Sequence, residues 1–426
     1  MNDCTLPTDA VGLETAAPSL LVRTARRLVH ARLRQVQRGE LTLIEGSERL
    51  CFGRTRAEGP LAASITIHDP RCYVDMAFGG SIGFGRSYME GAWSSPDLTA
   101  LGRLLLSNLE VMDGFEGGAA RLLAPFAKLA HAWRRNTRTG SRDNISAHYD
   151  LGNELFSTFL DETMMYSCAF FEHEQATLFE ASAAKNDRIC RKLSLTPDDH
   201  VLEIGAGWGG FAVHAASRYG CRVTTTTIAR RQFDYATKRV RDAGLEDRVS
   251  VLLTDYRDLT GRYDALVSIE MIEAVGHHYF DAYFRQCAER LSPQGRMLIQ
   301  AITVGDQRYD RVRKSVDFIK HYIFPGCCLP SVTQLCDVLT RSTDLRLLDL
   351  EDLTAHYPVT LRRWCERFMA NLPTVRSLGY PDSFIRMWEL YLRYCEAGFM
   401  ERYIGTVQMV MHKPLWREAS LAPIGR

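Results

Sequence analysis

The sequence predicts an α/β protein with a mostly parallel sheet covered by helices on both faces, preceded by a smaller α+β unit. Three observations lead to this fold class. The chain has 426 residues, a length that exceeds what one compact domain usually holds, and 46% of the residues are hydrophobic. Its second half alternates buried strands with amphipathic helices, the pattern of successive βαβ units. Its first part instead shows short alternating strands broken by proline and glycine.

Bulk composition argues against several classes of protein. The formal net charge is +1, so no overall field attracts a polyanion, and we do not expect nucleic acid as a partner. The 12 cysteines lack the paired spacing of a zinc site, which predicts no bound metal and a reducing cytoplasm. The sequence has neither a signal-peptide pattern nor about 18 consecutive apolar residues, so we expect neither secretion nor a membrane span.

The N-terminal region combines one helix with short strands. Residues 1–18 lack a periodic pattern, and we expect a disordered lead-in. Residues 20–38 have apolar side chains at helical spacing and six arginines without an acidic residue. This helix could lie on an anionic bilayer or, as most such helices do, pack on its own domain with a solvated basic face. Alternation between 41 and 75 predicts strands, and residues 79–85 a glycine-rich turn.

We place a domain boundary near residue 130, with a first domain at 19–126, a basic linker at 127–142 and a second domain at 143–426. The second domain is the one that alternates strands with helices. Its predicted strands are 201–204, 222–227, 249–253, 265–269 and 297–302, and its predicted helices are 211–219, 231–243 and 279–291.

A glycine-rich turn, Gly-Ala-Gly-Trp-Gly-Gly at 205–210, follows the first of these strands. Such glycines let the backbone turn sharply and approach a ligand closely. A dinucleotide site would add an acidic residue at the end of the next strand, but that strand ends in Thr227, Ile228 and Ala229. Trp208 is also bulky where a diphosphate would need close backbone contact. A nicotinamide cofactor is therefore disfavoured.

The stretch Glu-Ile-Gly-Ala-Gly-Trp-Gly at 203–209, with Asp255 and Tyr256 after the third strand, resembles class I S-adenosylmethionine methyltransferases, which have a seven-stranded sheet. The resemblance implies that the glycine turn holds the methionine part and that residues after the third strand contact adenine, to which Tyr256 would offer a flat apolar face. The cofactor-binding residues that it implies are Tyr149, Tyr166, Ser167, Glu203, Gly205, Gly207, Thr227, Ile228, Gln232, Asp255 and Tyr256.

Three further segments resemble the cyclopropane-fatty-acyl-phospholipid synthase family: 147–156 with 165–171, 270–276, and 322–331. Residues 83–93 also resemble the accessory, lipid-binding domain of members that use phospholipids. The resemblance implies a cytoplasmic enzyme, peripheral to the inner face of the membrane, that transfers a methylene group from S-adenosylmethionine to a cis double bond of a phospholipid acyl chain. It implies a cyclopropane product and suggests a homodimer.

The chemistry of this reaction gives aromatic residues a role in the site. An alkene is a poor nucleophile, so its π bond must be held in line with the sulfonium methyl, and water that would trap the carbocation must be excluded. Aromatic faces can stabilise that cation, although core packing explains the same residues equally well. The candidates are Tyr149, Phe170, Phe171, Tyr322 and Phe324.

Ring closure needs a base, which in the family is believed to be a bound bicarbonate. The resemblance assigns its binding to Cys168, Glu273, Gln300 with Ile302, and Tyr357. Gln300 stands where the best-known members have a histidine, and an amide can donate a hydrogen bond but cannot shuttle a proton. We expect a raised pKa for Glu273 beside an anion.

Two further residues near these motifs are candidates with a structural alternative. Glu270 is the less favoured carboxylate, since a structural hydrogen bond at the strand end would explain it. Cys395 matches a cysteine position of the family that has been suspected of catalysis. Methyl transfer requires no thiolate, so we favour packing for Cys395.

Other functions remain open. If the cation loses a proton without closing a ring, the product is a methylene- or methyl-branched chain, and both the 270–276 segment and Gln300 resemble members assigned to such branching. A nicotinamide-dependent oxidoreductase and a non-catalytic lipid carrier are more remote alternatives.

Overall fold

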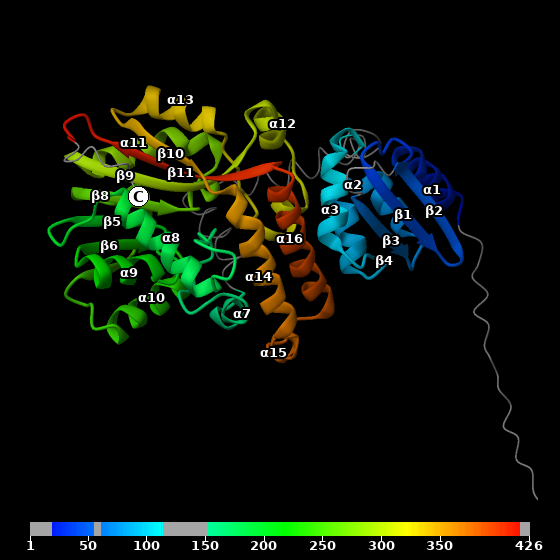
Figure 1. The fold of residues 1–426 in the computed structure, drawn as a ribbon, viewed down its shortest axis with the longest axis horizontal. Coiled ribbons are helices and arrows are strands. Elements are labelled where there is room, and N and C mark those ends of the chain that lie inside the picture. The colour runs from blue at the N-terminus through cyan, green and yellow to red at the C-terminus, as the bar shows by residue number, and fades with distance from the viewer. Residues whose placement is uncertain (1–18, 55–60, 112, 114–150, 418–426) are drawn as a thin grey trace, which may run out of the picture.

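The computed structural model describes residues 19–54, 61–111, 113 and 151–417. The lead-in expected at 1–18, the linker expected at 127–142 and Tyr149 lie outside the described residues. Two separate sheets organise the described chain (Figure 1), one of four strands near the N-terminus and one of seven strands. No helix among the described residues is long and apolar enough to cross a membrane.

The N-terminal unit is a small α+β structure, as predicted. Strand β1 pairs antiparallel with β2 and parallel with β3, and the sheet order is β2-β1-β3-β4. The Val22, Ala25, Val29 and Leu33 side chains of α1 are buried. The elements are α1 (Leu20–Leu33), β1 (Gly39–Glu45), β2 (Glu48–Arg54), β3 (Ala62–Ile67), α2 (Cys72–Met89), β4 (Trp93–Ser94) and α3 (Leu98–Ser107).

The turn predicted at 79–85 is wrong, because these residues lie inside α2. The helix is kinked at Gly80, whose φ of 55° is left-handed, a conformation that glycine adopts without strain. The other glycines allow close packing instead. A Cβ on Gly83 would collide with the backbone of Asp75, and one on Gly85 with the ring of Phe318. Gly83 therefore allows the two halves of α2 to approach each other, and Gly85 allows α2 to pack against the segment that carries Phe318.

The seven-stranded sheet has the order β10-β11-β9-β8-β5-β6-β7. Strands β5 to β9 run parallel to one another, whereas β11 is antiparallel to both β9 and β10. From β5 the chain proceeds to β6 and β7 on one side and then returns to β8 on the other, so the strand order switches between β5 and β8. Ligands of open α/β sheets bind at the carboxyl ends of strands at such a switch point.

Sequence periodicity located most elements of this sheet within one or two residues. Strand β9 begins six residues before the predicted 297, and β10 and β11 were not predicted. The strands are β5 (His200–Ile204), β6 (Arg222–Thr227), β7 (Val249–Leu253), β8 (Tyr263–Ile269), β9 (Leu291–Val304), β10 (Arg346–Asp352) and β11 (Ile404–His412). The helices that follow strands or flank the sheet are α8 (Leu178–Lys192), α9 (Gly210–Tyr219), α10 (Arg230–Asp242), α11 (Phe280–Arg290) and α13 (Val332–Ser342).

Additional helices cover the carboxyl edge of the sheet and contact the N-terminal unit, with α16 lying beside α3 (Figure 1). The Arg386 guanidinium donates to the carbonyl oxygens of Tyr88 at 2.5 Å and Trp93 at 2.8 Å. These helices are α7 (Asn153–Ser157), α12 (Tyr309–Lys314), a π-helical turn (Ile319–Ile323), α14 (Tyr357–Ala370), α15 (Leu372–Ser377) and α16 (Asp382–Met400). Short 3₁₀ turns span Tyr256–Asp258, Ile272–Ala274, His277–Tyr279, Asp306–Arg308 and Thr354–His356.

Candidate active site

The glycine turn lies directly after β5, at the switch point. Gly205 has φ of 100° and Gly207 has φ of 50°, left-handed values that residues with a Cβ rarely adopt. The N–H groups of Gly205 and Ala206 donate to the carbonyl of Thr226 at 3.0 and 2.8 Å. The turn is therefore fixed to β6 and leaves a cavity above it.

Trp208 explains why a bulky residue follows these glycines. Its ring is 2% exposed and its Nε1 donates to Oδ1 of Asn153 at 2.8 Å. The ring also packs against Phe156 with centroids 4.8 Å apart. Trp208 thus ties the turn to α7, which belongs to the first of the family-like segments.

The far end of the same cavity carries charged and aromatic groups after β7. Arg257 donates from Nε and a terminal nitrogen to the Asp255 carboxylate at 2.8 and 2.6 Å. The Tyr256 ring packs edge-on against Tyr283 at 5.2 Å, which fixes the plane of the ring. After β6, the Thr227 hydroxyl donates to Oε1 of Gln232 at 2.8 Å.

Ten of the eleven predicted cofactor residues line this one cavity, and the eleventh, Tyr149, lies outside the described residues. The cavity fits an amino acid joined to a nucleoside. Its glycine turn allows close backbone contact with the amino acid, and the fixed ring of Tyr256 and the Asp255 carboxylate at the other end suit the nucleoside. Sequence reasoning missed Arg257 in the wall, because no motif or periodicity marks it, and it did not single out Met165 and Ala274 within the family-like segments 165–171 and 270–276. The ten are Tyr166, Ser167, Glu203, Gly205, Gly207, Thr227, Ile228, Gln232, Asp255 and Tyr256.

A second cavity with a mainly apolar wall adjoins the first. Tyr166, Glu270 and Ala274 line both cavities, so the two meet at these residues. Part of the wall comes from α14, α16 and the π-helical turn. Its remaining lining includes Glu273, Ile302, Phe324, Leu329, Tyr357, Leu361, Tyr391, Tyr394, Cys395, Gly398, Phe399, Tyr403 and Ile404.

Of the aromatic residues singled out from the sequence, Phe324 lines the second cavity. Phe170 and Phe171 instead contact His356, with ring centroids 4.5 and 6.5 Å apart, and Tyr322 packs on Phe318. The structure therefore places these three in packing contacts outside the cavity lining. Sequence reasoning missed the aromatic residues of α16, which show only an ordinary amphipathic pattern.

Glu270 is the centre of the polar groups at the junction. Its Oε1 accepts from the N–H of Cys168 at 2.9 Å and from Nε2 of Gln300 at 2.8 Å, and its Oε2 accepts from the Tyr357 hydroxyl at 2.6 Å. Its backbone is left-handed, with φ of 50°, which is uncommon for a residue with a side chain. Burial raises the pKa of Glu270, while the bonds from Tyr357, Gln300 and Cys168 act in the opposite direction.

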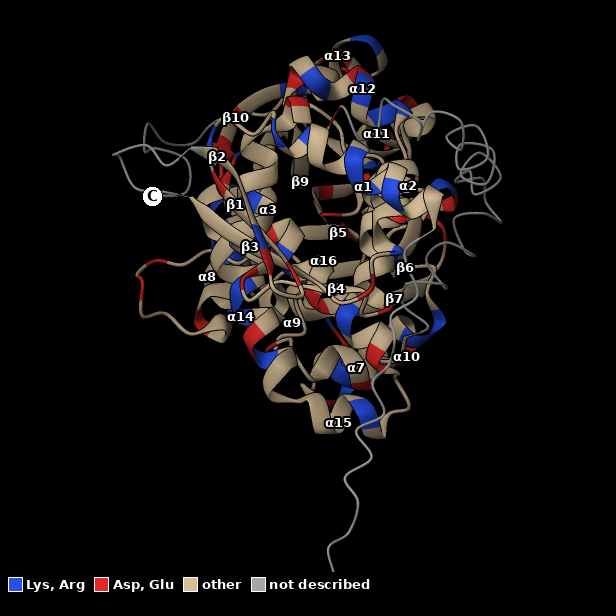
Figure 2. Cartoon of the chain, turned by 90° about the vertical axis from the view of Figure 1, so that its right-hand side faces the viewer, with Lys and Arg blue, Asp and Glu red and all other residues tan. Residues whose placement is uncertain are grey.

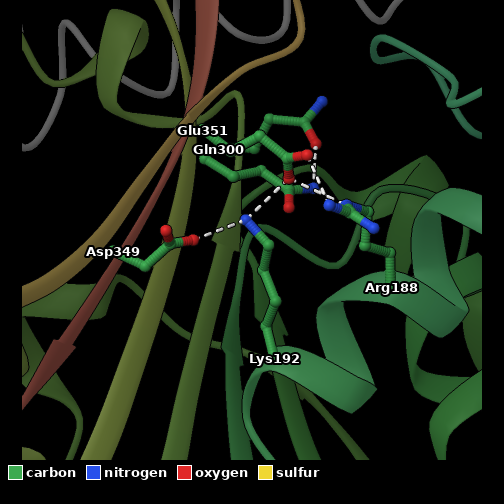
Figure 3. A network of polar contacts seen from close by, with 6 residues as sticks. Arg188, Lys192, Gln300, Asp349 and Glu351 are labelled. Atoms are coloured by element: carbon green, nitrogen blue, oxygen red, sulfur yellow. Dashed lines mark hydrogen bonds and ion pairs between the residues drawn. The ribbon is translucent and has the colours of Figure 1, made fainter. Parts of the chain in front are cut away.

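Gln300 is oriented by its cross-strand neighbour. Gln300 on β9 pairs with Gln408 on β11, and Nε2 of Gln408 donates to Oε1 of Gln300 at 3.1 Å. This contact directs Nε2 of Gln300 toward Glu270. Beside this pair, Arg188 and Lys192 tie α8 to β10 through Glu351 (Figure 3).

Glu273 faces the apolar cavity only. Its Oε1 accepts from the N–H of Ile302 at 2.5 Å, whereas Oε2 is buried and has no hydrogen-bond partner among the described residues. Burial, and to a smaller extent the nearby charge of Glu270, raises the pKa of Glu273 to about 8. The raised pKa agrees with the expectation from sequence, but its causes are burial and a second carboxylate.

Neither candidate thiol is ionised. Cys168 is fully buried, its Sγ donates to the carbonyl of Ala169 at 3.3 Å, and burial raises its pKa well above the ordinary value. Cys168 contributes its backbone N–H to Glu270 instead. Cys395 is half-buried on the cavity wall, and burial raises its pKa as well. A protonated thiol is a weak nucleophile, so Cys168 is best described as a buried core residue and Cys395 as a residue of the cavity wall.

The predicted bicarbonate does not fit this arrangement. The donors that we expected to bind it from Cys168, Gln300 and Tyr357 are all directed at the Glu270 carboxylate. An added anion would therefore meet two buried carboxylates, Glu270 and Glu273, without these donors. Negative charges that lie close together in a buried site disfavour one another strongly. No step is assigned to bicarbonate.

Comparison with known proteins shows the family of this chain. A family model described as mycolic acid cyclopropane synthetase matches residues 136–409. The tuberculostearic acid methyltransferase of Mycobacterium tuberculosis is 40% identical over 365 residues, covering 84% of this chain and 85% of that protein. The cyclopropane-fatty-acyl-phospholipid synthase of Escherichia coli is 36% identical over 358 residues, covering 83% of this chain and 89% of that protein.

Solved structures show the same relationship. The cyclopropane synthase MmaA2 from Mycobacterium tuberculosis is 29% identical with a TM-score of 0.60, and a mycolic acid cyclopropane synthase complexed with SAH and CTAB is 30% identical with the same score. Each match covers 64% of this chain and 98% of the other. The seven-stranded sheet and its glycine turn are those of class I methyltransferases. The chain therefore belongs to the cyclopropane-fatty-acyl-phospholipid synthase family of S-adenosylmethionine-dependent methyltransferases.

Proposed function

We propose that the enzyme transfers the methyl carbon of S-adenosylmethionine to a cis double bond in a phospholipid acyl chain and closes a cyclopropane ring. Family membership already establishes S-adenosylmethionine-dependent modification of a lipid. The observation that supports the finer proposal is the meeting of the two cavities at Tyr166, Glu270 and Ala274. A methyl group at the mouth of the polar cavity would face an alkene in the apolar one.

Binding in the apolar cavity addresses the low reactivity of an alkene. The bound cofactor supplies an electrophilic methyl group, and the residues of the apolar wall hold the double bond against it and exclude water. Tyr166 and Tyr391 share a hydrogen bond between their hydroxyls at 2.7 Å, and Phe324 lies edge-on to Tyr391 at 5.8 Å. These rings offer π faces that stabilise a carbocation on the acyl chain.

Glu270 is the proton acceptor in this proposal. When the alkene π pair bonds to the methyl carbon, the bond from that carbon to sulfur breaks, its electron pair leaves with the thioether product, and the other alkene carbon becomes cationic. Glu270 then removes a proton from the added carbon, and the C–H pair forms the second C–C bond of the ring. The lipid gains one CH₂, and the proton remains on Glu270. A buried carboxyl with a raised pKa suits a general base near neutral pH.

The phospholipid would be reached from a membrane surface, and α1 is the element suited to contact it. The outward face of α1 exposes Leu21 and Leu28, which are 55% and 45% exposed, together with Arg23, Arg27 and Arg34. Figure 2 shows basic segments along this helix, which contains no acidic residue. Exposed apolar side chains flanked by basic ones are typical of helices that lie on anionic bilayers. Peripheral attachment, a cytoplasmic location and a homodimer stay predictions.

A methylene-branched product is the second candidate, and Glu273 is the observation that favours it. Glu273 lines the apolar cavity, and its buried Oε2 has no hydrogen-bond partner among the described residues, which suits exchange of a proton with the acyl chain itself. One of the two relatives described above is named for methyl transfer and the other for cyclopropane formation. Both products carry the same added CH₂.

The test is turnover of cofactor with vesicles of a defined cis-unsaturated phospholipid, followed by NMR of the released acyl chains. Ring protons and loss of olefinic signals support the proposal. An olefinic or reduced branched chain without a ring contradicts ring closure and supports the second candidate. Pelleting with anionic but not neutral vesicles, weakened when Arg23 and Arg27 become glutamate, tests the role of α1.

A further inference from the structure

Lys185 is a buried lysine that the proposed reaction does not use directly. It lies in α8, its side chain is fully buried, and its Nζ donates to Oγ of Ser167 at 3.1 Å. A lysine is almost never fully buried unless its charge is paired. The neighbours of this ammonium group therefore indicate what it does.

The residue that Lys185 contacts belongs to a segment shared by both cavities. Ser167 lines the cofactor cavity, and the preceding Tyr166 lines both cavities. The following Cys168 donates its N–H to Glu270 at 2.9 Å. The hydrogen bond from Lys185 to Ser167 therefore fixes a segment of three residues. Tyr166 and Ser167 line the cofactor cavity, Tyr166 also lines the apolar cavity, and Cys168 bonds to Glu270, the proposed proton acceptor.

No carboxylate among the described residues lies within ion-pair distance of Lys185, but Glu203 and Glu270 line the same cavity as its partner Ser167. Glu203, at the end of β5, and Glu270, after β8, are both buried, and each has a pKa that burial raises and that Lys185 counteracts. Asp161 also faces the ammonium, but the Ser182 hydroxyl and the Thr163 N–H already bond to its carboxylate.

Two further titratable groups face this site and are neutral. Burial lowers the pKa of His214 on α9 to about 4, so this imidazole adds no positive charge. The Cys168 thiol is protonated, as described above. Burial also lowers the pKa of Lys185 to about 8, against the opposing effect of Glu270.

We propose that Lys185 is a positioning residue whose ammonium group is the shared counter-charge of Glu203 and Glu270 and, through Ser167, fixes the segment between the two cavities. The proposal rests on the assignment of Glu270 as proton acceptor. Without a nearby cation, a buried carboxylate takes up a proton, and a protonated Glu270 accepts no further proton. Lys185 would thereby link the cofactor side of the site to its base.

The test compares pH profiles of turnover for three variants on unsaturated phospholipid vesicles. In Lys185→Met the ammonium is lost, so the rise of kcat with pH should move upward by about one pH unit, the effect of an opposite charge on a carboxylate. Lys185→Arg keeps the charge, so the rise of kcat with pH should return to its wild-type position. Because arginine does not deprotonate, this variant should also lack a wild-type decline above about pH 8.

Lys192 offers a matched control, since it lies two turns along the same helix and is also buried. Its Nζ contacts Asp349 at 2.9 Å and Glu351 at 2.8 Å at the sheet edge (Figure 3), outside both cavities. Lys192→Met should lower thermal stability and leave the pH profile in place. The proposal is overturned if folded Lys185→Met shows the wild-type rise of kcat with pH, or if Lys192→Met shifts that rise by the same amount.

A binding measurement keeps this proposal separate from the lipid reaction. S-adenosylmethionine carries a sulfonium charge that S-adenosylhomocysteine lacks. In Lys185→Met, binding of the sulfonium should expel protons from the carboxyl groups, so calorimetry in two buffers of different ionisation enthalpy should show more proton release than in wild type. S-adenosylhomocysteine should show no such difference. Equal proton release in both proteins refutes the counter-charge, even if the lipid substrate is misassigned.

Discussion

Replacing Glu270 by glycine tests whether the Glu270 carboxylate is the base that a bound bicarbonate would otherwise supply. The substitution removes the carboxylate but leaves its three donors, on Cys168, Gln300 and Tyr357, around an empty space. Glycine also suits the left-handed backbone at this position, φ 50°, and so relieves a strain of about 1 kcal/mol. The variant should therefore fold.

The expected loss follows from the role of the residue. A positioned general base contributes about 10² to 10⁴ in rate, or roughly 3 to 5 kcal/mol of barrier, so kcat of Glu270→Gly should fall by that factor. Bicarbonate has the shape and charge of the missing carboxylate and would meet donors that are already in place. Saturating bicarbonate should restore turnover by about tenfold or more, within the range of general-base catalysis.

The assay measures product from unsaturated phospholipid vesicles in buffer freed of carbon dioxide, with and without added bicarbonate. Glu270→Gln is the matched control, because its amide fills the space and should be equally slow but not rescued. Wild-type turnover should not respond to bicarbonate. The reasoning fails if wild type needs bicarbonate, or if Glu270→Gly without bicarbonate stays within about threefold of wild type, far below a general-base effect.

Three other substitutions test separate parts of the structure. Because the pKa of Glu273 is raised to about 8 in the folded protein, its burial weakens folding as pH rises from about 4.5 to 8, so Glu273→Gln should raise the free energy of unfolding by roughly 2 to 4 kcal/mol at pH 9. Urea titrations that show the same difference at pH 5 and 9 would contradict this. Tyr256→Ala should weaken S-adenosylhomocysteine binding about three- to tenfold by calorimetry, as loss of one stacked ring predicts. Arg386→Ala removes a cation–π contact with Tyr88 at 4.0 Å and the hydrogen bonds to Tyr88 and Trp93, and should lower stability by about 1 to 3 kcal/mol. An unchanged urea midpoint would show that this contact does not hold the two units together.

The sequence predicted the sheet domain well because its elements have strong local signals. The strand at 201–204 is continuously apolar except for one glutamate, the glycine turn follows it directly, and the helix at 279–291 buries one face at regular spacing. The glycines at 79–85 misled, since local sequence cannot distinguish a turn from a helix that needs small residues against Phe318, more than 200 positions away.

The cofactor residues were predicted by motif, whereas the roles of the two carboxylates were not. The sequence places Glu270 and Glu273 three positions apart in one segment, and Glu273 was favoured because it matches the family pattern. Which of them receives hydrogen bonds depends on residues distant in sequence, Cys168, Gln300 and Tyr357, and on the left-handed backbone of Glu270. Lys185 was missed for the same reason, because a lysine within a helix pattern predicts an exposed side chain.

Energetic comparison explains why a glutamate can persist in an unfavourable conformation. The left-handed backbone of Glu270 costs about 1 to 2 kcal/mol, and burial of its charge costs more. Against this stand three hydrogen bonds to a charged group, each contributing about 1.5 to 3 kcal/mol, and the attraction of Lys185. A carboxylate held in this way is present at every turnover and pays no entropy of association, unlike an ion captured from solution. The consequence is that a reaction whose base is part of the chain should depend on pH through Glu270 and Lys185 and not on the supply of carbon dioxide.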